Sequence, residues 1–203
     1  IDEYGADAVR VGLMLSSAAG NDLLFDESLC KQGKNFANKI WNAYRLIDSW
    51  KVDPEIDQPV SSKNAIICFE NTYNSALETV NDHFEKYRIS DALMTLYKLT
   101  WDDFCSWLLE VTKPDYGFAI DQKSMNQIKD QFQKILKLIH PFMPFLSEEI
   151  WHIIEPRNKS ESLVVSLWPV FENYNNKILK NYETVKQIVG AVRHFRKENN
   201  INQ

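Results

Sequence analysis

The sequence predicts an all-α fold, an antiparallel bundle of long helices with one minor β-strand. Three observations predict it. Apolar residues recur at alternating steps of three and four along several long segments, these segments are separated by prolines, glycines and polar clusters, and 44% of the 203 residues are hydrophobic. Because helices with one apolar face bury it against each other, we expect these segments to lie side by side in alternating directions.

The first two helices are predicted in the first quarter of the chain. One covers residues 1–18 and ends before a Gly-Asn-Asp break at 20–22, which a short apolar run follows. The other runs from about Glu27 to Trp50. Residues 52–62 contain two prolines, which hold the backbone before them in extended conformations, so we expect a linker there.

Three further helices are predicted over residues 62–87, 90–113 and 124–139. In each of them apolar residues lie three and four positions apart, which is the pattern of a helix buried along one side. Ser90 and Ser124 are expected to cap the second and the third of these helices. Together with the helix at 27–50 they give the bundle its four long members.

Several large side chains at helical positions are predicted in the core. Trp101 and Trp107 belong to the helix at 90–113, and Val111 continues its apolar spacing. Phe145 and Trp151 are expected to be held against the end of the bundle.

The last part of the chain is predicted to contain shorter elements. The run HPFMPFLSEEIW at 140–151 has two prolines, which fix the entry of the chain into a short helix. Residues 162–168 alternate in polarity and contain β-branched side chains, which predicts the minor β-strand. A final helix is expected over roughly 176–198.

The polar side of the helix at 27–50 is unusual because it contains no carboxylate between Glu27 and Asp48. At about 100° per residue its cations and carboxamides fall within roughly 140° of the helix circumference, with a tryptophan at the edge. These residues are Lys31, Lys34, Asn35, Asn38, Lys39, Trp41, Asn42 and Arg45. Residues 29–51 carry a net charge of +4, although the whole chain carries −5. The pattern favours a local site for an anionic partner.

Unpaired RNA bases on a phosphate backbone would fit this side of the helix. Its asparagines both donate and accept hydrogen bonds, as Watson–Crick edges require, and its cations suit phosphates. Trp41 can stack on a base, or it can be tucked into the bundle, and the whole surface can be an ordinary solvated one. Lys113 and the basic run Arg193–Lys197 offer a second phosphate contact, although helix ends matched to their dipoles are the simpler interpretation.

No catalytic or metal-binding pattern is found in the sequence. The four histidines are scattered, and the three cysteines lie far apart without a Cys-x-x-Cys pair. We therefore predict no catalytic residue, no metal site and no cofactor in this chain. Since no apolar run approaches the ~20 residues that span a bilayer, we expect no membrane partner. We also expect no DNA partner and a cytoplasmic location.

Five stretches resemble the C-terminal region of the valyl-tRNA synthetases, a family of class I aminoacyl-tRNA synthetases. They are GADAVR, GNDLLFDE, KNFANKIWNAYR, LTWDDFCSWLLEVTKP and HPFMPFLSEEIW. The resemblance implies a helix bundle of the class I anticodon-binding type at 29–155. It also implies a connecting segment from the catalytic core, after the KMSKS loop, at 1–28. A short strand and a C-terminal helix at 156–203 would then lead to a coiled coil further on.

The resemblance also implies a function. The parent enzyme would attach valine to its tRNA using ATP with magnesium, and this chain would recognise valine tRNA at its anticodon stem and loop, reading the central A and the final C. Neither HIGH nor KMSKS occurs here, and the chain opens at Ile1 within a helical pattern. We therefore expect a segment of a longer polypeptide, whose catalytic domain lies upstream and is a partner of this chain.

Two other classes of function stay open from the residues alone. One is a protein-interaction module, in which the helices present an apolar groove to a partner helix. The other is a free-standing enzyme, which the lack of a nucleophile, base and oxyanion donors in one place disfavours. Salt separates RNA binding from the first alternative, because binding through phosphates weakens steeply as ionic strength rises.

Overall fold

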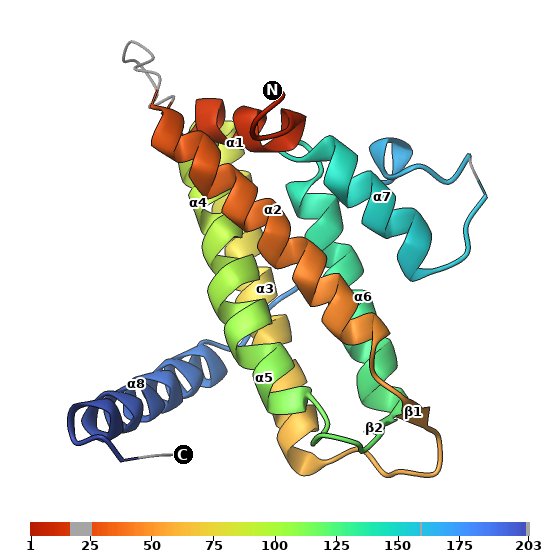
Figure 1. The fold of residues 1–203 in the computed structure, drawn as a ribbon, viewed down its shortest axis with the longest axis vertical. Helices are drawn as coiled ribbons and strands as arrows, with labels where there is room; N and C mark the ends of the chain where they lie inside the picture. Colours follow the sequence, from red (N-terminus) through yellow and green to blue (C-terminus); the bar gives the residue numbers. More distant parts are fainter. Residues whose placement is uncertain (17–25, 159, 202–203) are drawn as a thin grey trace.

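Four long helices of alternating direction form the bundle that the sequence predicts (Figure 1). The computed structural model describes residues 1–16, 26–158 and 160–201. The long helices are α2 (Glu27–Asp48), α3 (Val60–Glu85), the continuous helix formed by α4 (Ile89–Lys98), η1 (Leu99–Leu108) and α5 (Leu109–Thr112), and α6 (Gln122–Ile139). Helix α1 (Ala6–Ser16) precedes the bundle in the chain and lies across one end of it. After α6 the chain continues with α7 (Pro144–Ile154), the short 3-10 helix η2 (Leu163–Val165) and α8 (Asn176–Glu198). The all-α fold class is confirmed.

Aromatic side chains fill the centre of the bundle. The rings of Phe104 and Phe132 stack with centroids 5.3 Å apart, and the ring of Phe69 lies 5.5 Å from that of Phe104. All three side chains are fully buried. Each such side chain contributes about 1.5–3 kcal/mol by leaving water, so this cluster joins α3, η1 and α6 firmly.

The π-helical segment η1 changes which residues face the core. Leu99, Phe104 and Leu109 are buried at intervals of five, which is the spacing of a π-helix. The prediction that Val111 lies in the core is wrong, because its side chain is 43% exposed and Thr112 is buried in its place. Because the turns of η1 are wider than those of an α-helix, the buried position after η1 lies one residue later in the sequence. A spacing based on α-helical turns cannot predict this shift.

Two charged side chains fix α1 to the start of α7. The carboxylate of Asp7 accepts hydrogen bonds from the backbone N–H groups of Phe145, at 3.3 Å, and Leu146, at 2.7 Å. Arg10 donates to the backbone carbonyl of Pro141 at 2.9 Å. Asp7 therefore caps the N-terminus of α7 from a different helix, in place of a local cap.

The prediction of a β-strand at 162–168 is wrong. That segment contains η2, and its two valines are about 70% exposed, so the alternating pattern has no neighbouring strand to pair with. The strands of the described residues are instead the two-residue β1 (Val52–Asp53) and β2 (Ile120–Asp121), which pair in parallel. They connect the linker after α2 to the loop before α6.

The predictions that Ser90 and Ser124 cap helices are also wrong. Ser90 lies inside α4, where its hydroxyl donates to the backbone carbonyl of Leu15. Helix α6 is capped by Asp121, whose carboxylate accepts from the backbone N–H of Ser124 at 2.7 Å. The break predicted at 20–22 and the apolar run after it lie outside the described residues.

The aromatic residues expected around α7 differ in their burial. Trp151 is buried as predicted, and its indole Nε1 donates to the backbone carbonyl of Glu161 at 2.9 Å. The side chain of Phe145 is 67% exposed, which contradicts its predicted place against the bundle. Phe145 follows Pro144 in the first turn of α7, where Asp7 holds the backbone and the ring points outward.

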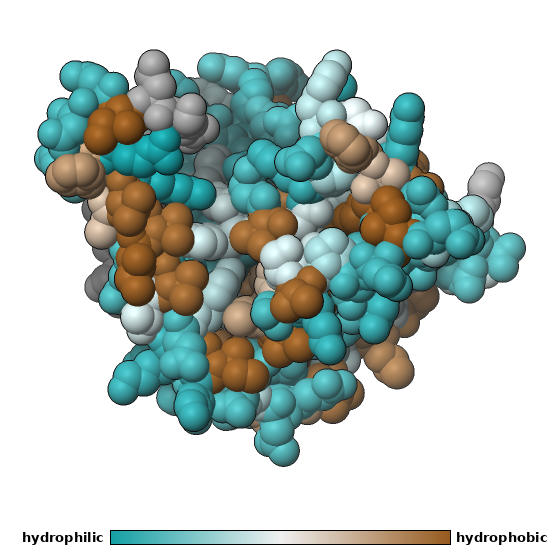
Figure 2. All heavy atoms as spheres, turned by 90° about the horizontal axis from the view of Figure 1, so that it is seen from below, coloured by the Kyte–Doolittle hydropathy of each residue, from teal (hydrophilic) through white to brown (hydrophobic). Residues whose placement is uncertain are grey.

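Helix α8 extends away from the bundle and contacts it through a few side chains (Figure 1). The ring of Trp107 meets that of Tyr182 edge-on, with centroids 6.2 Å apart, and the guanidinium of Arg193 lies 5.6 Å from the ring of Trp107. The ammonium of Lys186, on α8, forms an ion pair with Asp103 at 3.0 Å. On the exposed surface of α8, apolar side chains gather at the left of Figure 2. The prediction that Trp107 lies in the core is therefore wrong, because its side chain is half-buried at this contact.

Replacing Trp107 by alanine should reduce the free energy of unfolding by about 1–2 kcal/mol, because only part of the ring leaves water on folding. The loss should come mainly from the contact with α8. Urea unfolding followed by circular dichroism measures it, and Trp107→Phe, which keeps a ring, should lose less. A loss above about 3 kcal/mol would place Trp107 in the core after all.

Acid should weaken the α7 end of the structure. Burial lowers the pKa of His140, although the charges of Glu148 and Asp7 act to raise it. Burial acts to raise the pKa of Glu148, but hydrogen bonds from the backbone of Leu163 and the side chain of Ser162 outweigh it, so this pKa is lowered. Both groups hold fewer protons in the folded than in the unfolded chain. The contribution of both groups to the free energy of unfolding is therefore complete above pH 6.5, the ordinary pKa of histidine, and is lost as the pH falls.

We therefore expect the melting temperature to fall below about pH 6.5, first through His140, and again below about pH 4.5 through Glu148. Thermal unfolding measured over this range checks it. The variant His140→Asn should lose the first decrease and keep the second. A melting temperature that rises between about pH 7 and pH 5 would contradict the account.

Candidate nucleic-acid interface

The acid-free side of α2 lies on the outside of the bundle, where α2 crosses the front of Figure 1. We call its eight predicted site residues the α2 face. Six of them are exposed and two are half-buried: Lys31, Lys34, Asn35, Asn38, Asn42 and Arg45 are exposed, and Lys39 and Trp41 are half-buried. The buried side of the helix consists of Cys30, Gly33, Phe36, Ile40, Ala43 and Ile47. The structure thus brings the predicted residues together on one outer surface.

Most side chains of the α2 face are free to bind a ligand. Within the described part of the chain, Asn38, Asn42 and Arg45 make no side-chain hydrogen bond and no ion pair, and the same is true of Lys31 and Asn35. Residues three and four apart on a helix are about 5–6 Å from each other, so the asparagines and Arg45 form a continuous row. A ligand can use their donors and acceptors without breaking internal contacts.

Two lysines of the α2 face already have contacts. The ammonium of Lys34 donates to the backbone carbonyl of Glu3 at 2.9 Å and lies 5.8 Å from the ring of Tyr4. The ammonium of Lys39 lies over the ring of Trp101, 5.3 Å from its centroid. A phosphate would compete with a carbonyl for Lys34, so Lys34 is the less available of the two.

Trp41 lies at the edge of the α2 face and packs against the core. Its ring centroid is 5.6 Å from that of Tyr44, the next aromatic residue of the same helix. This half-buried position favours a structural role for Trp41 over base stacking, the two alternatives that the residues alone leave open.

A second tryptophan lies beside the α2 face. Tyr97 stacks on Trp101 with ring centroids 5.4 Å apart and planes 13° from parallel, and the ring of Phe36 lies 4.7 Å from that of Tyr97. The prediction that Trp101 is in the core is wrong, because the ring is half-buried beneath Lys39. One sequence signal could have indicated this: the helical spacing of Leu96, Thr100 and Phe104 passes over Trp101.

Three of the residues considered for a second phosphate contact have partners close by. The ammonium of Lys113 pairs with Glu110 at 2.5 Å, and His194 lies 3.1 Å from a carboxylate oxygen of Glu198. Arg193 lies against Trp107. These contacts favour the interpretation of both places as helix ends.

Other kinds of site find no support in the residues that the structure describes. No three or more His, Cys, Asp or Glu side chains come close enough there to hold a metal ion. None of the described helices has the length and apolar content needed to cross a membrane.

The antiparallel bundle with an acid-free outer face on α2 defines the class of this structure, an all-α helical domain. Residues 68–203 match the model of a family described as the anticodon-binding domain of tRNA ligase. The chain belongs to this family. The matched residues begin after α2, so the α2 face itself lies outside the match.

Two relatives match along the chain. The valine–tRNA ligases of Christiangramia forsetii and Parabacteroides distasonis are each 48% identical to it, over 202 and 201 residues. These alignments cover 100% and 99% of this chain and 23% of each relative, so the chain spans about a quarter of their length.

A solved structure has a similar fold. It is a LeuRS of Agrobacterium radiobacter in a ternary complex with tRNA and LeuAMS, and it matches with a TM-score of 0.59 at 16% identity. The match covers 87% of this chain and 20% of that one. At this identity the likeness establishes the fold alone.

Proposed function

We propose that this chain binds the anticodon stem and loop of valine tRNA as the recognition part of a valine–tRNA ligase. The α2 face carries the proposal, because it gathers cations and free carboxamides without an acid on a chain whose net charge is −5. Membership of the anticodon-binding family supports tRNA as the partner, and the names of the relatives support valine.

In this proposal the side chains of the α2 face make two kinds of contact with the RNA. Asn38 and Asn42 pair with the edges of the central A and the final C, while Arg45 and the lysines contact phosphates. Trp101 lies beside them as a platform on which a base can stack, which is worth about 1–3 kcal/mol. The free side chains of Asn38, Asn42 and Arg45 support the first two roles, and a base stacks on Trp101 by displacing the ammonium of Lys39 from its ring.

The whole protein would attach valine to this tRNA using ATP with magnesium, in a catalytic domain of the same polypeptide. Residues 1–28 would connect that domain to the bundle at 29–155, and residues 156–203 would lead away from it. The contact between α1 and α2 is close, since Gly33 of α2 faces the backbone of Ala8 without room for a side chain. A cytoplasmic location stays a prediction.

Binding of the valine anticodon stem-loop to the chain should weaken steeply with salt. If about four cations contact phosphates, the slope of log affinity against log salt concentration should be roughly −3. Fluorescence anisotropy between about 50 and 200 mM KCl measures it, and a stem-loop with a changed central base should bind more weakly with the same slope. A slope near zero would exclude the proposal and favour an apolar groove.

A further inference from the structure

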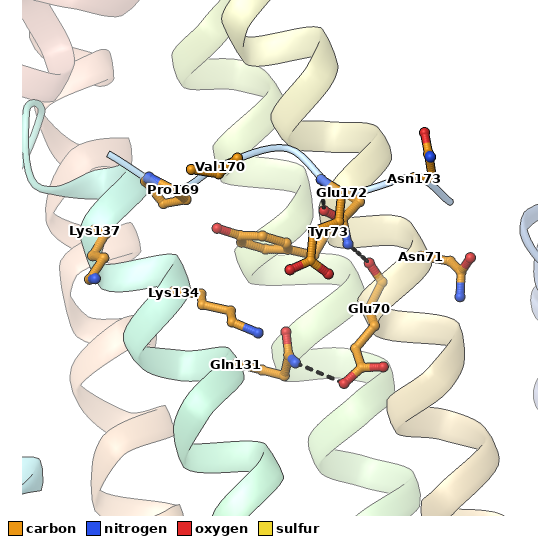
Figure 3. A pocket seen from close by; sticks show the side chains of 11 residues that line it. Glu70, Asn71, Tyr73, Gln131, Lys134, Lys137, Pro169, Val170, Glu172 and Asn173 are labelled. Carbon is orange, nitrogen blue, oxygen red and sulfur yellow. Dashed lines mark hydrogen bonds between the residues drawn. The ribbon is translucent and has the colours of Figure 1, made fainter. Parts of the chain in front are cut away.

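A polar cavity of about 390 Å³ lies between α3 and α6 (Figure 3). Residues 169–173 cross over it and form its roof, while α2 is on the front of the bundle in Figure 1. Side chains of α3 hold this roof in place. Asn74 accepts from the backbone N–H of Glu172 at 3.1 Å, Asn71 accepts from that of Asn175 at 2.7 Å, and Asn81 accepts from the indole of Trp168 at 3.0 Å. The cavity is therefore a built feature of the fold.

Two buried polar atoms of the cavity wall have no hydrogen-bond partner among the described residues. They are the hydroxyl oxygen of Tyr73 and the Oε1 atom of Gln131, whose residues are 4% and 1% exposed. The amide nitrogen of Gln131 donates to Glu70 at 3.2 Å, which fixes the side-chain orientation and leaves Oε1 toward the cavity. Because folded proteins pair nearly all buried polar groups with protein or ordered water, two such atoms around one cavity require partners that the described chain does not supply, which are water or a ligand.

The wall presents acceptors beside donors. Gln131 Oε1 and the carboxylate of Glu70 accept hydrogen bonds, and the ammonium of Lys134 donates them. Burial raises the pKa of Tyr73, so its hydroxyl keeps its proton and can donate as well. Two glutamates and two lysines line the cavity and balance each other in charge: Glu70, Lys134, Lys137 and Glu172. A neutral ligand with both donors and acceptors fits this wall better than a simple ion.

We propose that this cavity binds a guanine base. The Watson–Crick edge of guanine has two adjacent donors, N1–H and the N2 amino group, next to the acceptor O6. The two donors match Glu70 and Gln131 Oε1, and O6 matches the Tyr73 hydroxyl. Adenine and cytosine offer a single amino group and leave one acceptor unmatched. The proposal is independent of the proposed function, because it concerns other helices than α2.

The test titrates the 203-residue chain with 5′-GMP, using isothermal calorimetry. We expect saturable binding, with AMP, CMP and UMP at least about tenfold weaker and inosine monophosphate, which lacks the N2 amino group, in between. Gln131→Met should weaken GMP about tenfold. Gln122→Met, an exposed position of the same helix outside the cavity, is the matched control and should change nothing.

The variant Tyr73→Phe separates binding from folding. It removes a hydroxyl that has no partner, so the melting temperature should stay the same or rise, while GMP should bind several-fold more weakly. Absent GMP binding, equal binding of all four nucleotides, or unchanged GMP affinity in Tyr73→Phe would overturn the proposal. A single-stranded RNA with one guanine, compared with GMP, identifies the source: tighter binding of the RNA supports a base within RNA, and tighter binding of GMP supports a free nucleotide.

Discussion

A variant with Asn38, Asn42 and Arg45 all replaced by alanine should bind the valine anticodon stem-loop at least about a hundredfold more weakly than the unchanged chain. Each base-edge contact is worth about 1–3 kcal/mol, and every 1.4 kcal/mol is a factor of ten in affinity. The three side chains are exposed and make no hydrogen bond or ion pair with the residues that the structure describes, so the fold should be preserved. Anisotropy titrations at fixed salt measure the loss, and the melting temperature checks the fold.

In the matched control for this variant, alanine replaces Lys180 and Asn181, which are an exposed cation and an exposed carboxamide on α8. Its affinity for the stem-loop should be unchanged. If the whole protein is the valine–tRNA ligase proposed above, the α2 variant of that protein should have a lower kcat/KM for tRNA and unchanged valine-dependent pyrophosphate exchange. Equal affinities for the variant and the unchanged chain would remove the α2 face from the interface.

Replacing Phe132 by alanine should reduce the free energy of unfolding by about 3–5 kcal/mol. Phe132 is fully buried, and its ring stacks on that of Phe104 in the cluster that joins α3, η1 and α6. The substitution loses the transfer of the ring from water and leaves a cavity where three helices meet. Folded domains have about 5–15 kcal/mol of stability in total, so this substitution should remove a large part of it.

Urea unfolding followed by circular dichroism measures this loss. The control is Phe118→Ala, because that ring is 73% exposed in the loop before β2, and its loss should stay within about 0.5 kcal/mol. If Phe132→Ala were no more harmful than Phe118→Ala, the arrangement of the core would be incorrect.

The bundle and the α2 face could be predicted from the sequence because both depend on local periodicity. The apolar spacing of each helix determines which side is buried, and the absence of carboxylates between Glu27 and Asp48 marks the opposite side of α2. The failures have two physical causes. A π-helical turn shifts the residues after it, so Val111 is exposed, and the β-propensity at 162–168 produced no strand without a partner.

Contacts between distant residues could not be predicted from the sequence. Asp7 caps α7 from 138 residues away, and the ring of Trp101 meets Lys39 only because α2 crosses η1. The polar cavity is a similar case. Tyr73 belongs to the apolar spacing of α3, and Gln131 is a polar residue of α6, so their shared lack of partners becomes visible only when the two helices are placed together.

The most direct test of the account is a chemical-shift map of the isotope-labelled chain, titrated with the valine anticodon stem-loop and with a stem-loop whose central base is changed. We predict that the side-chain amides of Asn38 and Asn42 and the indole of Trp101 shift with the first RNA, and that the asparagine shifts weaken with the second. Shifts confined to α8 or to the cavity under residues 169–173, with α2 unchanged, would contradict it.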